Sequence, residues 1–341
     1  MRLNKKHPLY IEDLDRVLSV DGLECLSDKR ILVTGATGLI GVHLIDALMR
    51  LGTVEIIAIG RNKKNAEKRL GDHFDNPRFA FMEHDVLLPI MESVEADIVI
   101  PLASNTHPMA YSQFPVETIL VNIKGAEYAL DLARKTGAIV LYPSTVEVYG
   151  NSRNGMPFSE LDTGELNLST VRSCYTESKR VGESMCLSYL SEYGVASKTV
   201  RLSRVFGPTM LETDSKASSQ FITKALAAED IVLKSNGEQV FSYTYVSDAV
   251  AAMLYVLIKG KEGTVYNISS ELCNVKLKVF ARICADCCEK KVVFDFPSDA
   301  EAKGFSIAKN AIMDNSKLRA LGFVPRYGIK DAIERTISIL S

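Results

Sequence analysis

A tyrosine and a lysine four residues apart, Tyr175 and Lys179, are the two side chains in this sequence best suited to acid–base chemistry. Residues at positions i and i+4 are neighbours on one face of a helix. A protonated Lys179 beside Tyr175 would favour the phenolate and lower a tyrosine pKa that ordinarily lies near ~10. Such a phenolate can remove the proton of a hydroxyl group while the adjacent carbon gives up a hydride. The pair therefore predicts a general base that works beside a hydride acceptor.

A glycine-rich turn at residues 31–41 indicates what that acceptor is. An apolar strand leads directly into Gly35, Gly38 and Gly41, which are spaced as G-x-x-G-x-x-G before a helix. Glycines permit the tight turn and the close approach of a phosphate, and a helix N-terminus adds partial positive charge. We therefore expect a dinucleotide here, whose nicotinamide cation would also favour the Tyr175 phenolate. The residues expected to contact it are Gly35, Thr37, Gly38, Leu39, Ile40 and Gly41.

Short apolar strands and helical segments alternate from Arg30 onward. The expected elements lie at 30–34, 38–50, 54–59, 79–82, 97–102, 116–135, 138–142, 175–192 and 197–202. This alternation is typical of an α/β fold with a Rossmann-type doubly wound parallel sheet and helices on both faces. After residue 203 the segments become shorter and are interrupted by polar residues, which predicts a smaller C-terminal substrate-binding lobe over the ends of the strands.

The predicted organisation has three parts. They are an N-terminal helical extension (1–29), an NAD(P)-binding domain with the catalytic residues (30–202), and mainly a substrate-binding lobe with some segments returning to the first domain (203–341). Within the extension, residues 8–18 carry apolar side chains at helical spacing, with Leu14, Val17 and Leu18 on one face. This helix should pack on the domain or on a partner chain.

The composition favours a small-molecule substrate and a reducing compartment. The chain has 341 residues, 47% of them hydrophobic, and a formal net charge of −2, so no basic surface for nucleic acid or for a membrane is expected. No apolar run reaches the ~18 residues of a membrane span, and the N-terminal region is too charged for a secretory signal. Seven cysteines, an odd number, favour free thiols and a cytoplasmic location. Cys284, Cys287 and Cys288 have no histidine or second cysteine pair nearby in sequence, so we expect an ordinary helix with partly buried thiols and no metal.

Taken together, the motifs resemble the extended short-chain dehydrogenase/reductases that act on nucleotide sugars, from residue 30 to residue 340. The shared features occur in the family's order: Pro101-Leu-Ala-Ser104, Asn122, Pro143-Ser-Thr-Val-Glu-Val-Tyr-Gly150, Tyr175 and Lys179, Arg201-Leu-Ser-Arg-Val-Phe-Gly207-Pro208, Tyr245-Val-Ser-Asp248 and Tyr266-Asn267. The resemblance implies a nucleotide-sugar substrate and a tightly bound NAD or NADP that is recycled. It also implies a homodimer formed through the helices at 116–135 and 175–192.

The same resemblance implies roles for individual residues. Tyr175 is the base, Lys179 orients the ribose and tunes that base, and Thr145 polarises the reacting oxygen. Glu147 is the fourth catalytic residue, which orients the sugar or, in dehydration, serves as the acid. Further cofactor contacts fall on Arg61, Asp85, Val86, Leu102, Ala103, Ser104 and Asn122. Substrate contacts fall on Thr106, Ser144, Arg172, Arg204 and Tyr243.

The end of the second strand bears on the choice between NAD and NADP. An acidic residue there would bind the ribose hydroxyls of NAD, but this strand ends in Gly60, followed by Arg61. Without a carboxylate and with cations nearby, a 2′-phosphate is tolerated or slightly preferred. Alternatively, Arg61 stacks on adenine while NAD stays bound, so the sequence leaves both cofactors open.

Three reactions diverge after the C4 oxidation that the family shares: C4 epimerisation, loss of water across C5–C6, and loss of carbon dioxide from a C6 carboxylate. In dTDP-glucose 4,6-dehydratases an aspartate between the positions of Thr145 and Glu147 protonates the leaving hydroxyl. Here that residue is Val146, which cannot deliver a proton.

The sequence locally resembles UDP-glucuronate decarboxylases, at Leu102-Ala-Ser104, at Pro108 with Tyr111, and at Arg172-Ser-Cys-Tyr175. Decarboxylation needs little proton delivery at the leaving group, because a 4-keto uronic acid is a β-keto acid. We therefore expect decarboxylation or C4 epimerisation. The alternatives are dehydration, net reduction of a keto-sugar, and a non-catalytic dinucleotide sensor.

Three positions depart from the family pattern. The arginine that usually precedes Tyr-Val-x-Asp is Phe241, the asparagine of the Gly-Pro loop is Arg204, and the arginine after Gly-Pro is Thr209. Positive charge has therefore moved from one wall of the pocket to another. Because a guanidinium binds phosphate oxygens bidentately, Arg204 is the candidate clamp for the diphosphate. The competing interpretation is a structural ion pair.

Overall fold

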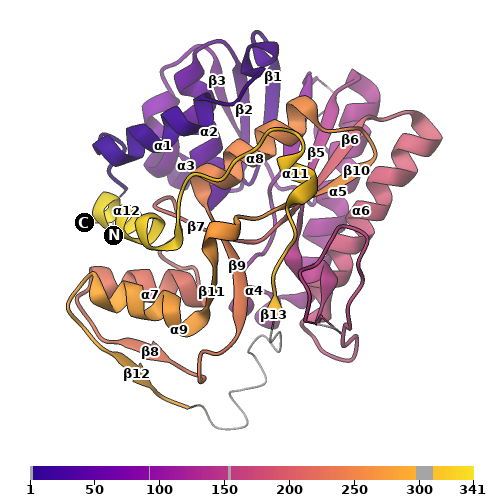
Figure 1. Cartoon of the computed structure of the whole chain (residues 1–341). Coiled ribbons are helices and arrows are strands. Elements are labelled where there is room, and N and C mark those ends of the chain that lie inside the picture. The colour runs from indigo at the N-terminus through magenta and orange to yellow at the C-terminus, as the bar shows by residue number, and fades with distance from the viewer. Residues whose placement is uncertain (1–2, 92, 153–154, 297–309) are drawn as a thin grey trace.

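A seven-stranded parallel sheet forms the centre of the molecule, in the order β10-β6-β5-β4-β1-β2-β3 (Figure 1). The computed structural model describes residues 3–91, 93–152, 155–296 and 310–341. The strands of this sheet are β1 (Arg30–Thr34), β2 (Glu55–Gly60), β3 (Phe79–Glu83), β4 (Ile98–Pro101), β5 (Ile139–Thr145), β6 (Ser197–Leu202) and β10 (Thr264–Ile268). Their nearly continuous apolar residues are what a parallel sheet covered on both faces requires.

Helices cover both faces of this sheet, as the alternating pattern predicted. On one face lie α2 (Leu39–Leu51), α3 (Lys63–Leu70) and α8 (Val246–Lys259), and on the other lie α5 (Pro115–Thr136) and α6 (Ser173–Tyr193). The doubly wound α/β fold is therefore confirmed. The predicted elements shift only at their ends; β5, for example, continues to Thr145.

The strand order reverses between β1 and β4, and the loops that follow these two strands meet there. A Cβ built on Gly35 would lie 2.7 Å from the backbone nitrogen of Ala103, and the Ala103 N–H donates to the Thr34 hydroxyl at 3.1 Å. In open α/β sheets, ligands bind in the crevice outside the carboxyl ends of the strands at such a reversal. This edge therefore positions the candidate site.

Smaller elements after residue 203 form a second hydrophobic core. They are β7 (Arg204–Phe206), α7 (Ala217–Leu226), β8 (Ile231–Leu233), β9 (Val240–Tyr245), β11 (Asn274–Lys276), α9 (Leu277–Asp286), β12 (Val292–Phe294), β13 (Asn310–Ala311) and α12 (Ile329–Leu340), here called the C-terminal lobe. The remaining short helices are α4 (Pro108–Gln113), α11 (Ser316–Arg319), η1 (Leu23–Leu26), η2 (Gly71–His73), η3 (Val146–Tyr149) and η4 (Glu271–Cys273).

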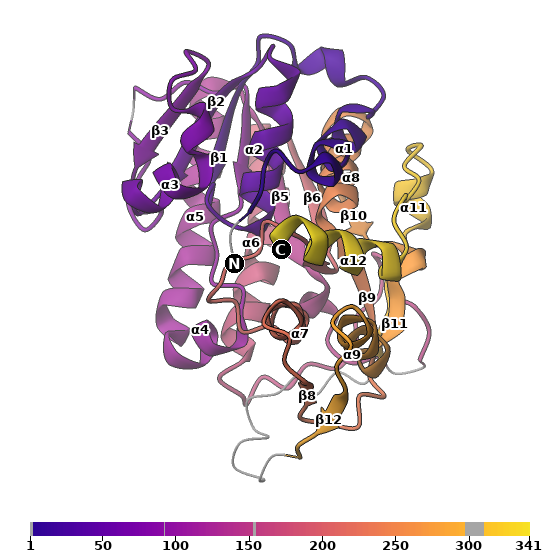
Figure 2. The same ribbon diagram turned by 90° about the vertical axis from the view of Figure 1, so that its left-hand side faces the viewer.

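The N-terminal helix predicted at residues 8–18 is α1 (Pro8–Leu18). It packs against α2, α8 and α12, and the N- and C-terminal ends of the chain lie close together in both views (Figures 1 and 2). Its buried side chains include Leu14 and Val17, as expected, but Leu18 is only half-buried, and the fully buried Asp13 was not anticipated. A carboxylate therefore sits within an otherwise apolar face.

Two further sequence features can be located. No helix in the described ranges is long and apolar enough to cross a membrane. Cys284 is buried on α9, Cys288 is half-buried and Cys287 is exposed, so the thiols are partly buried on and just after a helix, as predicted.

Gly41 provides a test of the glycine turn. A Cβ at this position would lie 2.6 Å from the carbonyl oxygen of Gly35 and 2.7 Å from that of Ala36. Gly41→Ala should therefore displace the turn, lower the free energy of unfolding by about 1–3 kcal/mol, and weaken dinucleotide binding. Thermal unfolding and calorimetric titration with NAD measure the two effects. Gly71→Ala is the control, because its Cβ would enter open space at a helical backbone angle; equal effects of both substitutions would contradict this account of the turn.

Candidate active site

Tyr175 lies in the first turn of α6, next to the carboxyl end of β5. Its side chain is buried and lies beside that of Thr145, the last residue of β5, which acts to lower the pKa of Tyr175. Lys179 follows one helical turn later and is also buried. The structure therefore brings together the three residues for which we expected roles at the reacting oxygen.

The expected acidity of Tyr175 is not found in the protein alone. Burial raises the pKa of Tyr175, and Thr145 and the charge of Arg172 offset this only in part. Lys179 is not among the groups that shift this pKa. Its Nζ instead donates to the Pro143 carbonyl at 2.9 Å. That Lys179 and a nicotinamide cation together lower the pKa of Tyr175 stays a prediction for the cofactor-bound enzyme.

Lys179 has an unusual protonation equilibrium of its own. Burial lowers the pKa of Lys179 to about 8, although the charge of Glu183 raises it. The Lys179 ammonium therefore loses its proton more readily than that of a surface lysine. Its hydrogen bond to the Pro143 carbonyl fixes its position. This arrangement suits a role in orienting a ribose hydroxyl beside Tyr175.

A chain of hydrogen bonds links the loop after β4 to the backbone of Tyr175. The Ser104 hydroxyl donates to Asn122 at 2.7 Å, and the Asn122 amide donates to Ser178 at 2.9 Å. The Ser178 hydroxyl in turn donates to the Tyr175 carbonyl at 3.0 Å. Ser178 was missed by the sequence reasoning, although its position three residues after Tyr175 on one helix could have identified it.

The ring of Tyr175 is also held by an aromatic neighbour. Tyr111 of α4 stacks on it with ring centroids 5.2 Å apart and planes 25° apart. The guanidinium of Arg172 lies 5.3 Å from the Tyr111 ring centroid. Tyr111 thus connects the base to a cluster of charged side chains.

That cluster is centred on Glu147, which lies between two arginines. Arg172 donates to both carboxylate oxygens, at 3.0 and 2.8 Å, and Nη2 of Arg204 lies 3.7 Å from Oε1. Burial raises the pKa of Glu147, but the charges of Arg172 and Arg204 outweigh burial and lower it overall. Glu147 is therefore ionised at neutral pH and cannot act as a proton donor there.

Arg204 faces the residue that replaces the family's usual arginine. Its guanidinium carbon lies 3.8 Å from the centroid of the Phe241 ring, a distance suited to a cation–π contact. Nη1 of Arg204 is buried and has no hydrogen-bond partner among the residues that the structure describes. Buried polar groups are normally paired, so this atom is suited to binding an anionic ligand. The pair with Glu147 shows that Arg204 also makes the ion pair considered as the alternative.

The glycine turn fits a dinucleotide. Gly38 is the N-cap residue of α2 and provides no side-chain hydrogen bond to the first turn, which therefore leaves N–H groups for a phosphate. Leu39, Ile40 and Gly41 begin that helix, and Leu102 and Ala103 form the opposite wall. The residues present therefore fit NAD, because the uncapped first turn of α2 could hold a pyrophosphate.

The residues expected to contact adenosine include one half of an ion pair. Arg61, just after β2, donates to Glu117 of α5 at 3.0 Å. The Asp85 carboxylate accepts from the Leu87 N–H at 3.0 Å, and thus supports a turn, while Val86 is buried at the edge of α5. The positive charge of Arg61 is therefore partly neutralised where the adenosine ribose is expected.

The remaining predicted substrate residues differ in their surroundings. The Ser144 hydroxyl donates to Glu183 at 2.5 Å, and Glu183 also pairs with Arg201. Tyr243 is buried among aromatic rings of the C-terminal lobe, and its ring centroid lies 4.8 Å from that of Phe280. Thr106 is exposed before α4, and no described hydrogen bond joins it to the cluster around Tyr175.

Residues 31–269 match the NAD dependent epimerase/dehydratase family. The chain belongs to this family. UDP-glucuronic acid decarboxylase 6 of Arabidopsis thaliana is 33% identical to it over 310 residues, which cover 90% of this chain and 87% of the relative. UDP-glucuronic acid decarboxylase 1 of Xenopus tropicalis is 37% identical over 233 residues, which cover 67% of this chain and 53% of the relative.

Solved structures share the fold. A dTDP-glucose 4,6-dehydratase from Streptomyces venezuelae has a TM-score of 0.79 at 23% identity, covering 91% of this chain and 96% of that structure. A UDP-glucuronic acid 4-epimerase from Bacillus cereus has a TM-score of 0.78 at 22% identity, and the match covers 91% of this chain and 98% of that structure. Like its family, the chain is an NAD-dependent enzyme.

Removal of the Tyr175 hydroxyl tests the base. Tyr175→Phe keeps the ring and its stacking on Tyr111, so cofactor binding should persist while turnover falls below detection, because proton removal contributes about 10²–10⁴-fold to such rates. Turnover and NAD content of the purified variant are the measurements. Tyr193→Phe, on the exposed end of α6, is the control; an active Tyr175→Phe enzyme would eliminate the mechanism.

Proposed function

We propose that this enzyme decarboxylates a nucleotide-activated uronic acid, of the UDP-glucuronate type, through a transient 4-keto intermediate. The observation that carries the proposal is the ionised Glu147 held between Arg172 and Arg204 beside the Tyr175–Thr145 pair. This cluster combines cationic groups for an acidic substrate with a shortage of proton donors.

The shortage of proton donors separates decarboxylation from dehydration. Loss of water requires an acid at the leaving hydroxyl. Val146 occupies the position of that acid and is buried, and the lowered pKa of Glu147 keeps the neighbouring carboxyl ionised. Loss of carbon dioxide leaves electrons on the sugar and needs no such acid.

The charges of the cluster favour an anionic substrate. Arg172 and Arg204 together carry one positive charge more than Glu147 neutralises, and Lys216 also contributes positive potential at this carboxylate. Nη1 of Arg204 has no partner in the described part of the chain. A diphosphate or a C6 carboxylate could satisfy this donor through charge-assisted hydrogen bonds.

The residues divide the reaction as follows. Thr145 and Tyr175 hold the C4 hydroxyl, and Tyr175 takes its proton as C4 becomes a ketone. The C5–C6 bond then breaks, carbon dioxide leaves, and the electron pair passes to the enolate of C5, C4 and the C4 oxygen, which Tyr175 and Thr145 stabilise by hydrogen bonding. C5 then takes up one proton, which the solvent supplies, while the proton held by Tyr175 returns to the C4 oxygen when the ketone is reduced. When bound, NAD supplies the hydride acceptor, returns the hydride at the end, and adds positive charge that favours the Tyr175 phenolate.

NAD is the better match to the adenosine groove than NADP. Arg61 is paired with Glu117, whose carboxylate would repel the 2′-phosphate of NADP. The slight preference for NADP rested on the missing carboxylate after β2 and on the nearby cations, and the pairing of Arg61 with Glu117 weakens the second of these.

C4 epimerisation of the same acidic substrate is the second candidate. Phe241 replaces an arginine that is usual throughout the family, so this position leaves both reactions open. Both reactions use Tyr175 and Thr145 in the first oxidation. They diverge only in the fate of the carboxylate.

Mass spectrometry of products distinguishes these reactions. The purified enzyme is incubated with UDP-glucuronate and with a panel of other nucleotide sugars, with absorbance at 340 nm followed in parallel. We expect UDP-glucuronate to lose the mass of carbon dioxide without net NADH accumulation. An unchanged mass with a changed NMR spectrum would assign epimerisation. Loss of the mass of water would contradict the proposal. If no sugar is converted, the remaining function is that of a non-catalytic dinucleotide sensor.

A charge swap tests Arg204 as the anion clamp. Arg204→Asn should raise the KM for the nucleotide sugar about 10-fold or more, the energy of one hydrogen bond between charged groups, with a smaller change in kcat. Adding Phe241→Arg should recover part of the loss, since it returns the charge to the opposite wall. Arg180→Asn, an exposed substitution on α6, is the control. An unchanged KM in Arg204→Asn would restrict Arg204 to its structural ion pair.

We also infer a homodimer formed through α5 and α6. Apolar side chains are exposed on both neighbouring helices, at Val116, Ile119 and Leu120 of α5 and at Val181 and Leu187 of α6. Such a patch favours a protein interface. Light scattering after gel filtration should give a dimer, and Leu120→Glu with Leu187→Glu should give a folded monomer. A monomeric parent protein would contradict the inference.

All seven cysteines are free thiols. We therefore propose a reducing, cytoplasmic environment for this enzyme.

A further inference from the structure

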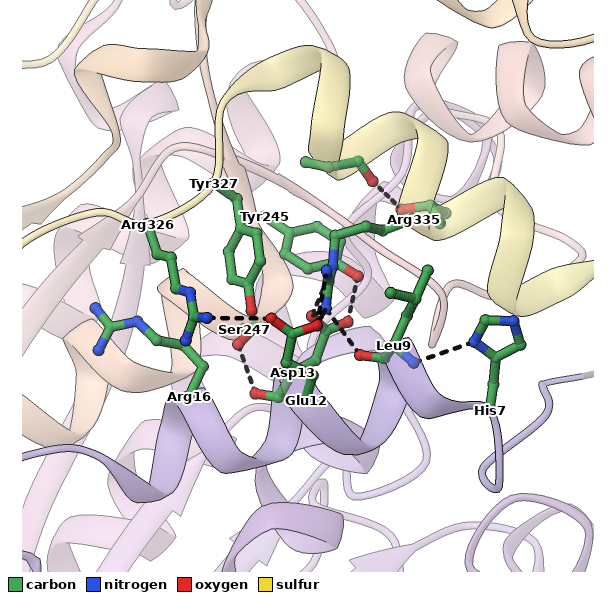
Figure 3. A network of polar contacts seen from close by, with 12 residues as sticks. His7, Leu9, Glu12, Asp13, Arg16, Tyr245, Ser247, Arg326, Tyr327 and Arg335 are labelled. Atoms are coloured by element: carbon green, nitrogen blue, oxygen red, sulfur yellow. Dashed lines mark hydrogen bonds and ion pairs between the residues drawn. The ribbon is translucent and has the colours of Figure 1, made fainter.

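A buried ionic network joins the N-terminal helix to the C-terminal lobe (Figure 3). Asp13 of α1 is fully buried and accepts hydrogen bonds from the Tyr245 hydroxyl at 2.5 Å and from Nη2 and Nε of Arg335 at 2.8 and 3.0 Å. The Ser247 hydroxyl donates to the backbone carbonyl of Asp13 at 2.7 Å. One residue of α1 thus holds the end of β9, the start of α8 and the helix α12.

These partners belong to different parts of the molecule. α1 packs on α2 and α8 of the NAD-binding domain and on α12, while α12 packs on α7, α9 and β9 of the C-terminal lobe (Figure 2). Arg335 also donates to the Leu9 carbonyl at 2.9 Å and to Glu12, and Arg326 donates to Glu12 at 3.1 Å. α1 therefore lies between the domain and the lobe.

The strand that Asp13 holds leads to the sugar site. In the β7–β9 ladder, Tyr245 pairs with Phe206 and Tyr243 pairs with Arg204. Phe241, farther along β9, stacks against the guanidinium of Arg204. A displacement at Tyr245 would therefore be transmitted along two hydrogen-bonded strands to Arg204.

We propose that Asp13 is a positioning residue for substrate binding: by holding Tyr245 and Arg335, it fixes the β9–β7 ladder that presents Arg204 to the substrate. The contribution of Arg204 to binding rests on the proposed function. The mechanical part, that Asp13 orders β7 and β9, does not depend on it.

The energetics of Asp13 favour a role in orientation. Burial raises the pKa of Asp13 to about 6, although the bonds from Tyr245 and Arg335 lower it. Desolvation thus outweighs the gain from its partners, and a buried ion pair of this kind contributes little net stability while it can fix a specific geometry. Apolar side chains at this position would fill the same interface without directing Tyr245.

Matched substitutions separate positioning from general stability. Asp13→Asn removes the buried charge. Tyr245→Phe removes only the hydroxyl and retains the Asp13–Arg335 pair, so this variant replaces Asp13→Asn in the test if Asp13→Asn folds poorly. Asp15→Asn is the control, because Asp15 lies on the same helix and pairs with Arg50 at 2.8 Å but is exposed. All are studied saturated with NAD, by hydrogen exchange with mass spectrometry and by kinetics with UDP-glucuronate.

In Asp13→Asn we expect faster amide hydrogen exchange in β7 and β9 and unchanged exchange in β1 to β5. Tyr245→Phe should show the same pattern to a smaller extent, and Asp15→Asn should exchange like the parent enzyme. β7 is informative because no hydrogen bond described for Asp13 reaches it. The KM for UDP-glucuronate should rise about 10-fold with kcat within about twofold, as expected when binding interactions alone are lost.

Other results would overturn the proposal. If amide exchange in Asp13→Asn rises as much in the central sheet as in β7 and β9, Asp13 only stabilises the whole fold. If exchange in β7 is unchanged, Asp13 does not order the strand that carries Arg204. An unchanged KM in an active variant would do the same. If the parent enzyme does not convert UDP-glucuronate, the proposed function fails while the exchange in β7 and β9 still decides whether Asp13 orders the ladder.

Discussion

The carboxyl ends of β1, β4 and β5 meet at one edge of the parallel sheet, and the candidate chemistry depends on that geometry. β1 ends in the glycine turn, β4 in the loop of Ala103 and Ser104, and β5 in Thr145. The hydrogen bonds from Ser104 through Asn122 and Ser178 then fix α6, and with it Tyr175, against the same edge. The sheet thus brings the glycine turn and the candidate base Tyr175 to the same edge without requiring long loops.

Electrostatics then select what this crevice can do. Burial raises the pKa of Tyr175, so the protein alone keeps the phenol protonated. Glu147 is driven in the opposite direction by Arg172 and Arg204. A site with an ionised carboxylate and two guanidinium groups is suited to anionic ligands and lacks an acidic carboxyl group at neutral pH. This balance favours loss of carbon dioxide over loss of water.

The N-terminal helix adds a constraint outside the residues that match the family, which begin at residue 31. Helix α1 packs on α2 and α8, and through Asp13 it joins them to the helix α12 and to the strand β9. Because β9 pairs with β7, an interaction remote from the crevice bears on the orientation of Arg204. In this chain Phe241 stands where the family usually has arginine, and Arg204 stands where it has asparagine. Binding of the diphosphate therefore depends more strongly on the orientation of Arg204.

The sequence by itself determined the doubly wound fold, the glycine turn, and the pairing of Tyr175 with Lys179 on one helix. These features are local: strand and helix periodicity, turn glycines and i, i+4 spacing are all set by near neighbours in the chain. Only the tertiary structure decided that Lys179 donates to Pro143, that Glu147 is shared by Arg172 and Arg204, and that Asp13 meets Tyr245 and Arg335. Those partners lie far apart in sequence, and protonation states depend on burial and on the distances between charges, which no spacing along the chain encodes.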